Sequence, residues 1–367
     1  MDTKILILGS DANAYYMARC AYEYTHKKAH LIGKDRLAFT KFSNILTIEY
    51  EPNLWNEQEF VRILNRYALK NIENRVLVIS TNETYSLFLA RNQKILEHNL
   101  VYFKQSAKVL ETLTNKEKFY KTYKTSSLSF QGKNKIYKIE SEEELLNTIN
   151  RIKSAGYQEK LILQEYIPGD DSYLFDSVVY VSKSGKVKVI SFAQIGLQER
   201  SKSMVGNAAC LINGFNTFKV DTSNMKENII TFMETLGMNG FFEFDMKYDK
   251  KSNTFKVLEI NARQGRCSYY LTPLKANLVE IMLKDLVLQE ELPFRDLKEE
   301  CLLSFVPKNI VKTYITNEDF KKEVLRLWKK RVSPMECPKD KNFKRFLMMK
   351  KRLWHYKKEY QNSYWKA

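Results

Sequence analysis

Two strand-like segments joined by a short polar turn constrain the fold of this chain more than any other feature. Residues 241–248 and 254–261 are rich in aromatic and branched apolar side chains, and residues 249–253 between them are polar. This pattern is typical of a β-hairpin, because aromatic and β-branched residues favour strands and short polar segments favour tight turns. The sequence therefore predicts two adjacent antiparallel strands.

The polar residues of this hairpin alternate along each strand, and residues two apart in a strand face the same side of a sheet. The shared face holds Glu243, Asp245 and Lys247 on the first strand and Glu259, Asn261 and Arg263 on the second. A turn centred near Ser252 places Asp245 opposite Glu259. Carboxylate and amide oxygens suit Mg²⁺, and a nearby arginine suits a phosphoryl group. The alternative is a solvent-exposed hairpin, although such a face would more usually carry Lys and Thr.

The first part of the chain alternates short apolar segments with helical patterns, which favours a parallel sheet covered on both faces. Strands are expected at residues 4–8, 29–32, 76–80 and 101–103, with one helix after the first strand and another at about 83–97. We assign residues 1–112 to this domain. The turn Gly9-Ser10-Asp11 lacks the further glycines of the dinucleotide-binding fingerprint, so we expect no dinucleotide there. We expect the turn to shape a substrate cleft, and the alternative is a purely structural turn.

A different pattern follows residue 112. Thr114-Asn115 can cap a helix, and Ser141 can cap another. The expected elements are strands at residues 135–139, 160–164, 172–181 and 186–194, and helices at residues 142–154 and 273–288. Beyond Glu291 the sequence is helical in pattern, basic and aromatic. The whole sequence contains neither a glycine-rich phosphate loop nor a persuasive Ser-His-Asp arrangement.

The positive charge is concentrated at the C-terminal end. The formal net charge is +17, and residues 321–367 carry 16 Lys and Arg against 4 Asp and Glu, a net charge of +12. Such a segment suits an anionic partner. None of the usual nucleic-acid-binding modules occurs in the sequence, so we expect no nucleic acid. The interleaved Trp and Tyr residues leave a peripheral contact with the inner face of a membrane open, and the alternative is a solvated helical face.

The cysteines and the longest apolar runs bear on the compartment. The five cysteines are scattered and form no Cys-x-x-Cys pair, which favours a reducing, cytoplasmic compartment over a disulfide framework or a zinc site. No apolar run approaches the roughly 18–20 residues of a membrane-spanning helix.

The hairpin and a segment upstream of it resemble the ATP-grasp superfamily of carboxylate–amine ligases. Leu258-Glu259-Ile260-Asn261-Ala262-Arg263, preceded by Phe242-Glu243-Phe244-Asp245, is similar to the metal-binding end of that fold, and residues 161–171 are similar to the hinge between its lobes. The resemblance implies an α/β chain with α+β lobes. Its expected parts are an N-terminal parallel-sheet domain (1–112), an ATP-grasp domain (113–290) with a shortened lid at residues 124–165, and a basic, aromatic, mainly helical region (291–367).

The same resemblance implies roles for individual residues. It assigns Mg²⁺ binding to Asp245, Glu259 and Asn261, and stabilisation of the transferred phosphate to the catalytic residues Arg200 and Arg263. ATP would be held by Lys116 and Lys124 at its phosphates and by Gln164, Glu165, Ile167 and Asp171 at its adenine and ribose. The Val-x-Lys-Pro-like context that usually surrounds the second lysine is absent, and Lys124 is the candidate for its role.

Residues 7–19 and Gly33-Lys34 are similar to the corresponding parts of D-aspartate ligases of Gram-positive cell-wall synthesis. This narrower resemblance implies that ATP phosphorylates the β-carboxylate of D-aspartate. The lysine ε-amine of an anionic peptidoglycan precursor would then attack the acyl phosphate. The alternatives are an ATP-grasp ligase for a different amino acid or small amine, and a non-catalytic nucleotide-binding module.

Overall fold

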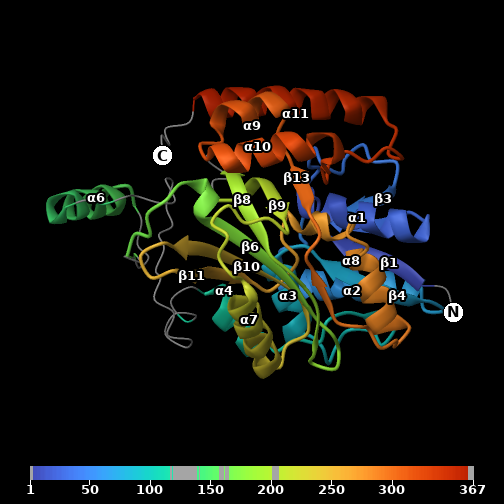
Figure 1. Cartoon of the computed structure of the whole chain (residues 1–367). Helices are drawn as coiled ribbons and strands as arrows, with labels where there is room; N and C mark the ends of the chain where they lie inside the picture. The colour runs from blue at the N-terminus through green and yellow to red at the C-terminus, as the bar shows by residue number, and fades with distance from the viewer. Residues whose placement is uncertain are drawn as a thin grey trace.

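Two β-sheets organise the chain in the computed structural model (Figure 1). The structure describes residues 3–115, 118, 139, 141–156, 161, 165–200 and 206–362. Three predicted nucleotide-binding residues, Lys116, Lys124 and Gln164, lie outside the described residues, as do most of the strands predicted at residues 135–139 and 160–164.

The first sheet is parallel and covered by helices on both faces, as the sequence predicts. Its strand order is β3 (Leu46–Tyr50), β2 (Ala29–Gly33), β1 (Thr3–Leu8), β4 (Arg75–Ser80) and β5 (Leu100–Val101). Ile5 and Ile7 of β1 pack in one core with α1 (Ala12–Thr25), whereas Leu6 and Leu8 pack in another with α2 (Glu57–Lys70) and α3 (Glu83–Arg91). The sequence analysis found neither β3 nor α2, and it placed the end of α3 six residues too late.

The second sheet contains the predicted hairpin. Its order is β11 (Thr254–Asn261), β10 (Gly240–Asp249), β6 (Leu174–Val181), β8 (Ala193–Gln198), β9 (Ala208–Asn213) and β13 (Cys301–Ser304), with β7 (Val187–Ser191) beside β6 and β12 (Arg295–Leu297) beside β7. The single strand predicted at 186–194 is divided at Phe192 into β7 and β8. Both halves pair with β6.

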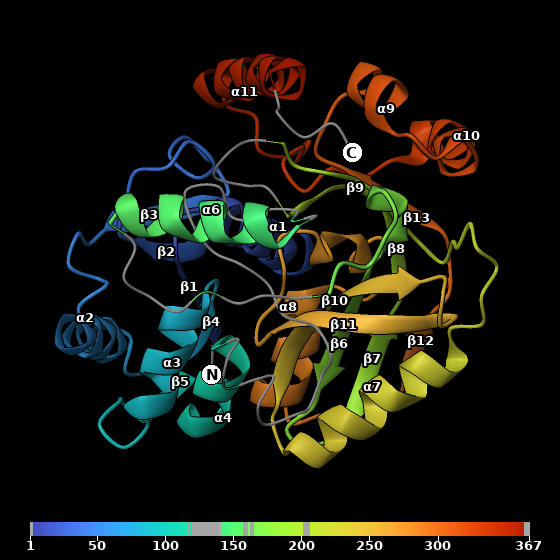
Figure 2. The ribbon, with the colours of Figure 1, turned by 90° about the vertical axis from the view of Figure 1, so that its left-hand side faces the viewer.

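The two faces of this second sheet meet different neighbours. Phe175 and Val179 of β6 pack in a core with Ile229 and Met233 of α7 (Ser223–Leu236). On the opposite face, Val178 and Tyr180 of β6 and Phe241 of β10 share a core with β1, α1 and α8 (Leu278–Met282). Figure 2 shows the two sheets side by side, with α7 on the outer side of the second. Residues of β10 that lie an even number of positions from Phe241, such as Asp245, therefore face the first sheet.

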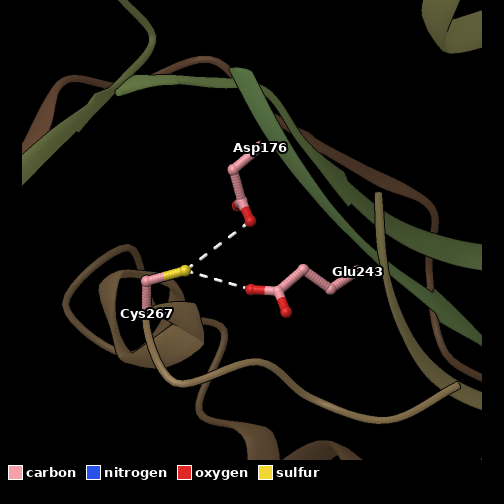
Figure 3. Close-up of side chains that lie close together, drawn as sticks. All are labelled: Asp176, Glu243 and Cys267. Carbon is pink, nitrogen blue, oxygen red and sulfur yellow. Dashed lines mark hydrogen bonds between the residues drawn. The ribbon is translucent and has the colours of Figure 1, made fainter. Parts of the chain in front are cut away.

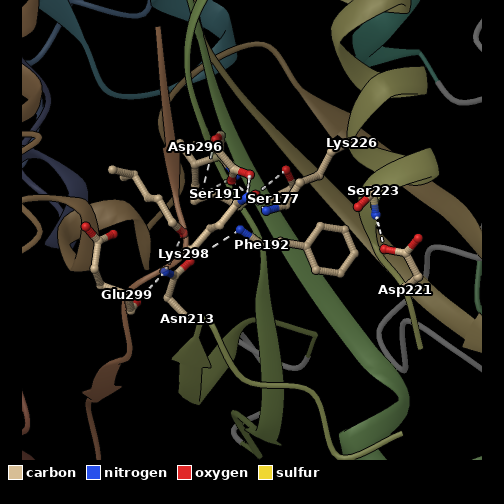
Figure 4. A network of polar contacts seen from close by, with 12 residues as sticks. Ser177, Ser191, Phe192, Asn213, Asp221, Ser223, Lys226, Asp296, Lys298 and Glu299 are labelled. Atoms are coloured by element: carbon tan, nitrogen blue, oxygen red, sulfur yellow. Dashed lines mark hydrogen bonds and ion pairs between the residues drawn. The ribbon is translucent and has the colours of Figure 1, made fainter. Parts of the chain in front are cut away.

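A polar network joins residues 295–299 to the middle of the second sheet (Figure 4). The Asn213 side chain donates to the carbonyl oxygens of Leu297 and Glu299 at 2.9 and 2.8 Å and accepts from the amide of Phe192 at 3.3 Å. Lys226 of α7 donates to Asp296 at 2.6 Å. The sequence analysis expected helices beyond Glu291 and missed the short strands β12 and β13.

Helices form most of the remaining chain. They are α4 (Ala107–Thr114), α6 (Glu142–Ser154), α9 (Lys308–Tyr314), α10 (Glu318–Leu327) and α11 (Phe343–Gln361), with short helical turns at η1 (Asp171–Tyr173), η2 (Ser268–Leu271), η3 (Leu283–Val287) and η4 (Trp328–Lys330). The Ser141 hydroxyl caps α6, as predicted. The helix predicted at 273–288 starts at Leu278, because the Asn277 side chain accepts from the amides of Val279 and Glu280. Among the described residues no helix is both long and apolar enough to cross a bilayer.

Candidate functional site

Three adjacent strands bring carboxylates together on the face that looks toward the first sheet. Strand β10 lies between β6 and β11, and Asp245 on β10 stands opposite Asp176 of β6 and Glu259 of β11. Cβ atoms of directly opposed residues in antiparallel strands lie about 4.5–5.5 Å apart. The pairing of Asp245 with Glu259 is the register that the sequence predicts, and Asp176 is an addition that it missed.

The second hairpin strand supplies an amide beside these acids. Asn261 stands opposite Glu243 in the register, and its Nδ2 donates to Oδ2 of Asp245 at 3.1 Å. The register shifts immediately after Asp245, so the strands are irregular there. Asp245, Glu259 and Asn261 are only partly buried, unlike the acids behind them. Partly accessible carboxylate and amide oxygens match the donors that Mg²⁺ takes, so these three residues fit the ion.

A buried trio lies next to this row of acids (Figure 3). Cys267 Sγ donates to Glu243 Oε1 at 3.0 Å and to Asp176 Oδ2 at 3.6 Å, and Tyr270 Oη donates to Asp176 Oδ1 at 2.9 Å. Burial, reinforced by Asp245, raises the pKa of Asp176 to about 7. Burial and Asp176 also raise the pKa of Glu243, against the opposing effect of Arg263. The two carboxyls therefore lose their protons at a higher pH than exposed acids do.

Gly265 allows the Glu243 carboxylate to occupy this position. A Cβ at residue 265 would lie only 1.7 and 1.8 Å from the two Glu243 oxygens. The carbonyl of Gly265 also accepts from Tyr16 Oη of α1 at 2.8 Å. The chain after Asn261 is thus fixed against the carboxylate on one side and against the first domain on the other. The alternation in the hairpin pointed to Glu243, but nothing in the sequence pointed to Gly265.

Arg263 lies where the two sheets meet. Its Nε forms an ion pair with Glu83 Oε1, at the start of α3, at 2.7 Å. Burial alone would lower the pKa of Arg263, but Glu83, Glu243 and Asp11 together raise it, so the guanidinium stays charged. Burial raises the pKa of Asp11, an effect that Arg263 and the Ala14 amide oppose. The predicted turn at residues 9–11 and the predicted arginine therefore belong to one site.

The predicted hinge residue Asp171 pairs with the predicted catalytic Arg200. Asp171 Oδ2 accepts from Arg200 Nη2 at 3.1 Å and from the backbone amide of Gln198 at 2.8 Å. Burial raises the pKa of Asp171, and Arg200 opposes that rise. The carboxylate thus holds the end of β8 beside η1. Of the other predicted hinge residues, Glu165 is exposed and Ile167 is partly buried.

Lys247 connects this hinge to the strand that carries Asp245. Its Nζ donates to the carbonyl of Gly169 at 3.2 Å and lies 5.2 Å from the ring centroid of Tyr166. Burial lowers the pKa of Lys247, although Asp171 and Asp170 favour its charged form. The sequence analysis placed Lys247 on the polar face of the hairpin and gave it no role.

A second buried ion pair, which the sequence analysis missed, lies beside Arg200. Arg266 Nη2 donates to Glu199 Oε1, and the same oxygen accepts from Tyr356 Oη of α11 at 2.8 Å. Tyr360 Oη donates to the carbonyl of Gln198 at 2.6 Å. Helix α11 therefore packs directly against the residues that lead to Arg200. Residues so distant in the chain give no local signal of this contact.

The comparisons with known proteins agree with this architecture. No protein-family model matches the chain. The sequence is 26% identical over 398 aligned positions to the D-aspartate ligase of Enterococcus faecium (strain Aus0004), and the match covers 94% of this chain and 93% of that relative.

Two solved structures are similar over most of the chain. N5-carboxyaminoimidazole ribonucleotide synthetase from Thermus thermophilus superposes with a TM-score of 0.60 at 13% identity, covering 91% of this chain and 99% of that one. N5-carboxyaminoimidazole synthetase from Staphylococcus aureus complexed with ADP gives 0.59 at 13% identity, covering 84% and 83%. The chain has the ATP-grasp fold. The expected fold is thereby confirmed, and residues 242–245 and 258–263 occupy β10, β11 and the loop after them.

Proposed function

We propose that the chain is an ATP-dependent ligase that joins the β-carboxylate of D-aspartate to the lysine ε-amine of a peptidoglycan precursor. The observation that carries the proposal is the register of β10, in which Asp245 stands between Asp176 and Glu259, with Asn261 bonded to it. The similarity to the D-aspartate ligase of E. faecium supports the choice of amino acid. The anionic acceptor rests on the sequence resemblance and on the basic C-terminal segment.

The reaction would proceed in two balanced steps. A carboxylate oxygen of the amino acid attacks the γ-phosphorus of ATP, the bond to the β-phosphate oxygen breaks, and ADP leaves. The amine nitrogen then attacks the acyl carbon, the bond to the phosphate oxygen breaks, and phosphate leaves while the nitrogen loses a proton. The first step joins two anions, and both steps expel an anionic leaving group, so positive charge and excluded water lower both barriers.

The oxygens of Asp245, Glu259 and Asn261 would hold Mg²⁺ on the strand face toward the first sheet. When bound, the ion supplies charge neutralisation on the ATP phosphates, worth several kcal/mol in such sites. Behind these ligands lie the buried carboxyls of Glu243 and Asp176, whose pKa values burial raises.

Arg263 and Arg200 would act on the phosphoryl and acyl groups. The Arg263 guanidinium is charged and lies beside the turn at residues 9–11, where we place the amino acid. Arg200 is held by Asp171 next to the hinge. For ATP, we propose contacts from Glu165, Ile167 and Asp171 at the adenine and ribose. Lys116, Lys124 and Gln164 complete the proposed nucleotide site from the sequence resemblance alone.

Release of ADP from Mg-ATP tests this function. The assay contains a UDP-linked lysine pentapeptide and a panel of D- and L-amino acids. We expect turnover with D-aspartate, and we expect Glu259→Gln to lower it about 10²–10³-fold, the usual effect of losing one preorganised electrostatic partner. The matched control is Glu290→Gln, an exposed residue after η3, which should retain wild-type turnover.

The other results of the panel distinguish the alternatives. Turnover with a different amino acid retains the ligase chemistry and changes the substrate. ATP binding without turnover for any amino acid contradicts the ligase proposal and favours a nucleotide-binding module. Unchanged turnover in Glu259→Gln contradicts the assignment of the metal ligands.

A further inference from the structure

Helix α11 presents an apolar stripe to solvent. The large apolar residues exposed on it are Phe343, Phe346, Leu347 and Trp354, with exposed fractions of 73%, 53%, 50% and 53%. Successive residues of an α-helix are rotated by about 100°, so residues 343, 347 and 354 fall within about 40° of one another. We call the side of α11 that carries these four residues its outer face. Figure 1 shows α11 at the edge of the molecule, beyond α9 and α10.

Exposed lysines lie beside and within this apolar stripe. Lys344, Lys351 and Lys358 lie along one side of it, Lys350 and Lys357 lie between Phe343 and Phe346 within the same face, and all five are exposed. The helix contains seven Lys and Arg and a single acidic residue, Glu359, which is only partly exposed. Lys358 Nζ lies 3.8 Å from the ring centroid of Trp354. Apolar side chains accompanied by cations on one helix face are the pattern of helices that lie in a lipid–water interface.

The inner face of α11 fixes its orientation. Buried Arg345 forms an ion pair with Asp340 at 3.0 Å and donates to the carbonyl oxygens of Phe39 and Met335. Tyr356 and Tyr360 make the hydrogen bonds to Glu199 and Gln198 described above. These contacts hold Arg345, Tyr356 and Tyr360 against the rest of the protein. The stripe therefore cannot turn inward without breaking them.

We propose that the outer face of α11 docks on a membrane surface that contains anionic lipids. The apolar stripe would enter the boundary between headgroups and acyl chains, and the lysines would meet the lipid phosphates. Charge argues against a second copy of this chain as the occupant, because two such basic faces would repel each other. The apolar stripe argues against nucleic acid, whose backbone offers it nothing to bury against. The proposal does not depend on the ligase activity.

Flotation of the full-length chain with lipid vesicles tests the proposal. One set of vesicles contains phosphatidylcholine with about one third phosphatidylglycerol, and the other contains phosphatidylcholine alone. We expect the protein to float with the anionic vesicles and to bind the neutral ones at least tenfold more weakly, because each lysine near an anionic surface contributes about a factor of five.

Two variants separate the charge from the apolar stripe, and each has a matched control. Lys350→Glu/Lys357→Glu should weaken binding to the anionic vesicles at least tenfold, whereas Lys250→Glu/Lys251→Glu, in the exposed turn of the β10–β11 hairpin, should not. Phe343→Ser/Leu347→Ser should weaken it similarly, whereas Leu69→Ser/Ile95→Ser, exposed apolar residues of the first domain, should not. Unchanged thermal midpoints establish that the α11 variants are folded.

Three results would overturn the proposal. The first is failure of the wild-type chain to float with anionic vesicles. The second is equal loss of binding in the α11 variants and their controls, which would assign binding to net charge alone. The third is a protein concentration-dependent dimer in sedimentation that Phe343→Ser/Leu347→Ser abolishes, which would assign the stripe to a second copy.

Discussion

Replacing Gly265 with alanine should disturb the candidate site through a single steric contact. The added Cβ would lie 1.7 and 1.8 Å from the Glu243 oxygens, far inside van der Waals contact, so the carboxylate must move. Glu243 is buried and accepts from Cys267 at 3.0 Å, and its movement would break that bond. Overpacking of a buried site costs about 1–3 kcal/mol, and loss of one hydrogen bond adds about 1 kcal/mol. We therefore expect Gly265→Ala to lower the free energy of unfolding by about 2–4 kcal/mol.

The assay for this prediction is a double-mutant cycle with Glu243→Asp, in which urea unfolding gives the free energy of unfolding of each variant. Shortening the acid by one methylene withdraws its oxygens from residue 265, so the second change should recover at least half of the loss caused by the first. The control is Gly237→Ala. It adds a Cβ to open space in the left-handed region (φ 67°), so it should cost stability without any coupling to Glu243. Additive effects of Gly265→Ala and Glu243→Asp would refute the steric explanation.

Three further changes test other parts of the site. Asp171→Asn should weaken the ion pair with Arg200 and lower the thermal midpoint by several degrees, with a raised KM for ATP; an unchanged KM would separate this pair from the nucleotide. Arg263→Lys should retain the fold yet lower kcat about 10²–10³-fold, because lysine cannot reproduce a guanidinium fork; near-normal kcat would remove Arg263 from the catalytic residues. The folded-state pKa of Asp176, raised to about 7, means that the folded chain holds a proton which the unfolded chain has lost above about pH 4, so stability attributable to this group falls as the pH rises from about 4 to 7. As the pH rises from 5 to 8, the free energy of unfolding of Asp176→Asn should therefore increase by a few kcal/mol relative to that of the wild type. A difference between the two free energies of unfolding in urea that does not change with pH would contradict that pKa.

The hairpin and its register could be predicted because their signals are local. Alternation within β10 and β11 defines the two faces, and the turn between the strands sets which residues are opposed, so Asp245 and Glu259 could be paired from the sequence. The cap of α6 at Ser141 is similarly local. The parallel first sheet followed from the alternation of strands and helices, although its edge strand β3 was too weakly apolar to be recognised.

The missed parts of the site depend on contacts between distant segments. Asp176 joins the acids only because β6 pairs with β10. An isolated acid in an apolar strand gives no indication of which strand will lie beside it. Cys267 approaches Glu243 through the loop after β11, and Glu199 meets Tyr356 across 157 residues of sequence. Strands β12 and β13 are three and four residues long, too short to show a period. The division into domains and the roles of the site residues stay predictions.

Transfer of oxygen from the amino acid to phosphate tests the ligase mechanism most directly. D-aspartate labelled with ¹⁸O in its β-carboxylate is incubated with the enzyme, Mg-ATP and the lysine-containing precursor, and the inorganic phosphate is examined by mass spectrometry. An acyl phosphate intermediate requires one labelled oxygen to leave with each phosphate, so we predict one ¹⁸O atom per phosphate released with the ligated product. Product formation with unlabelled phosphate would contradict the proposed mechanism.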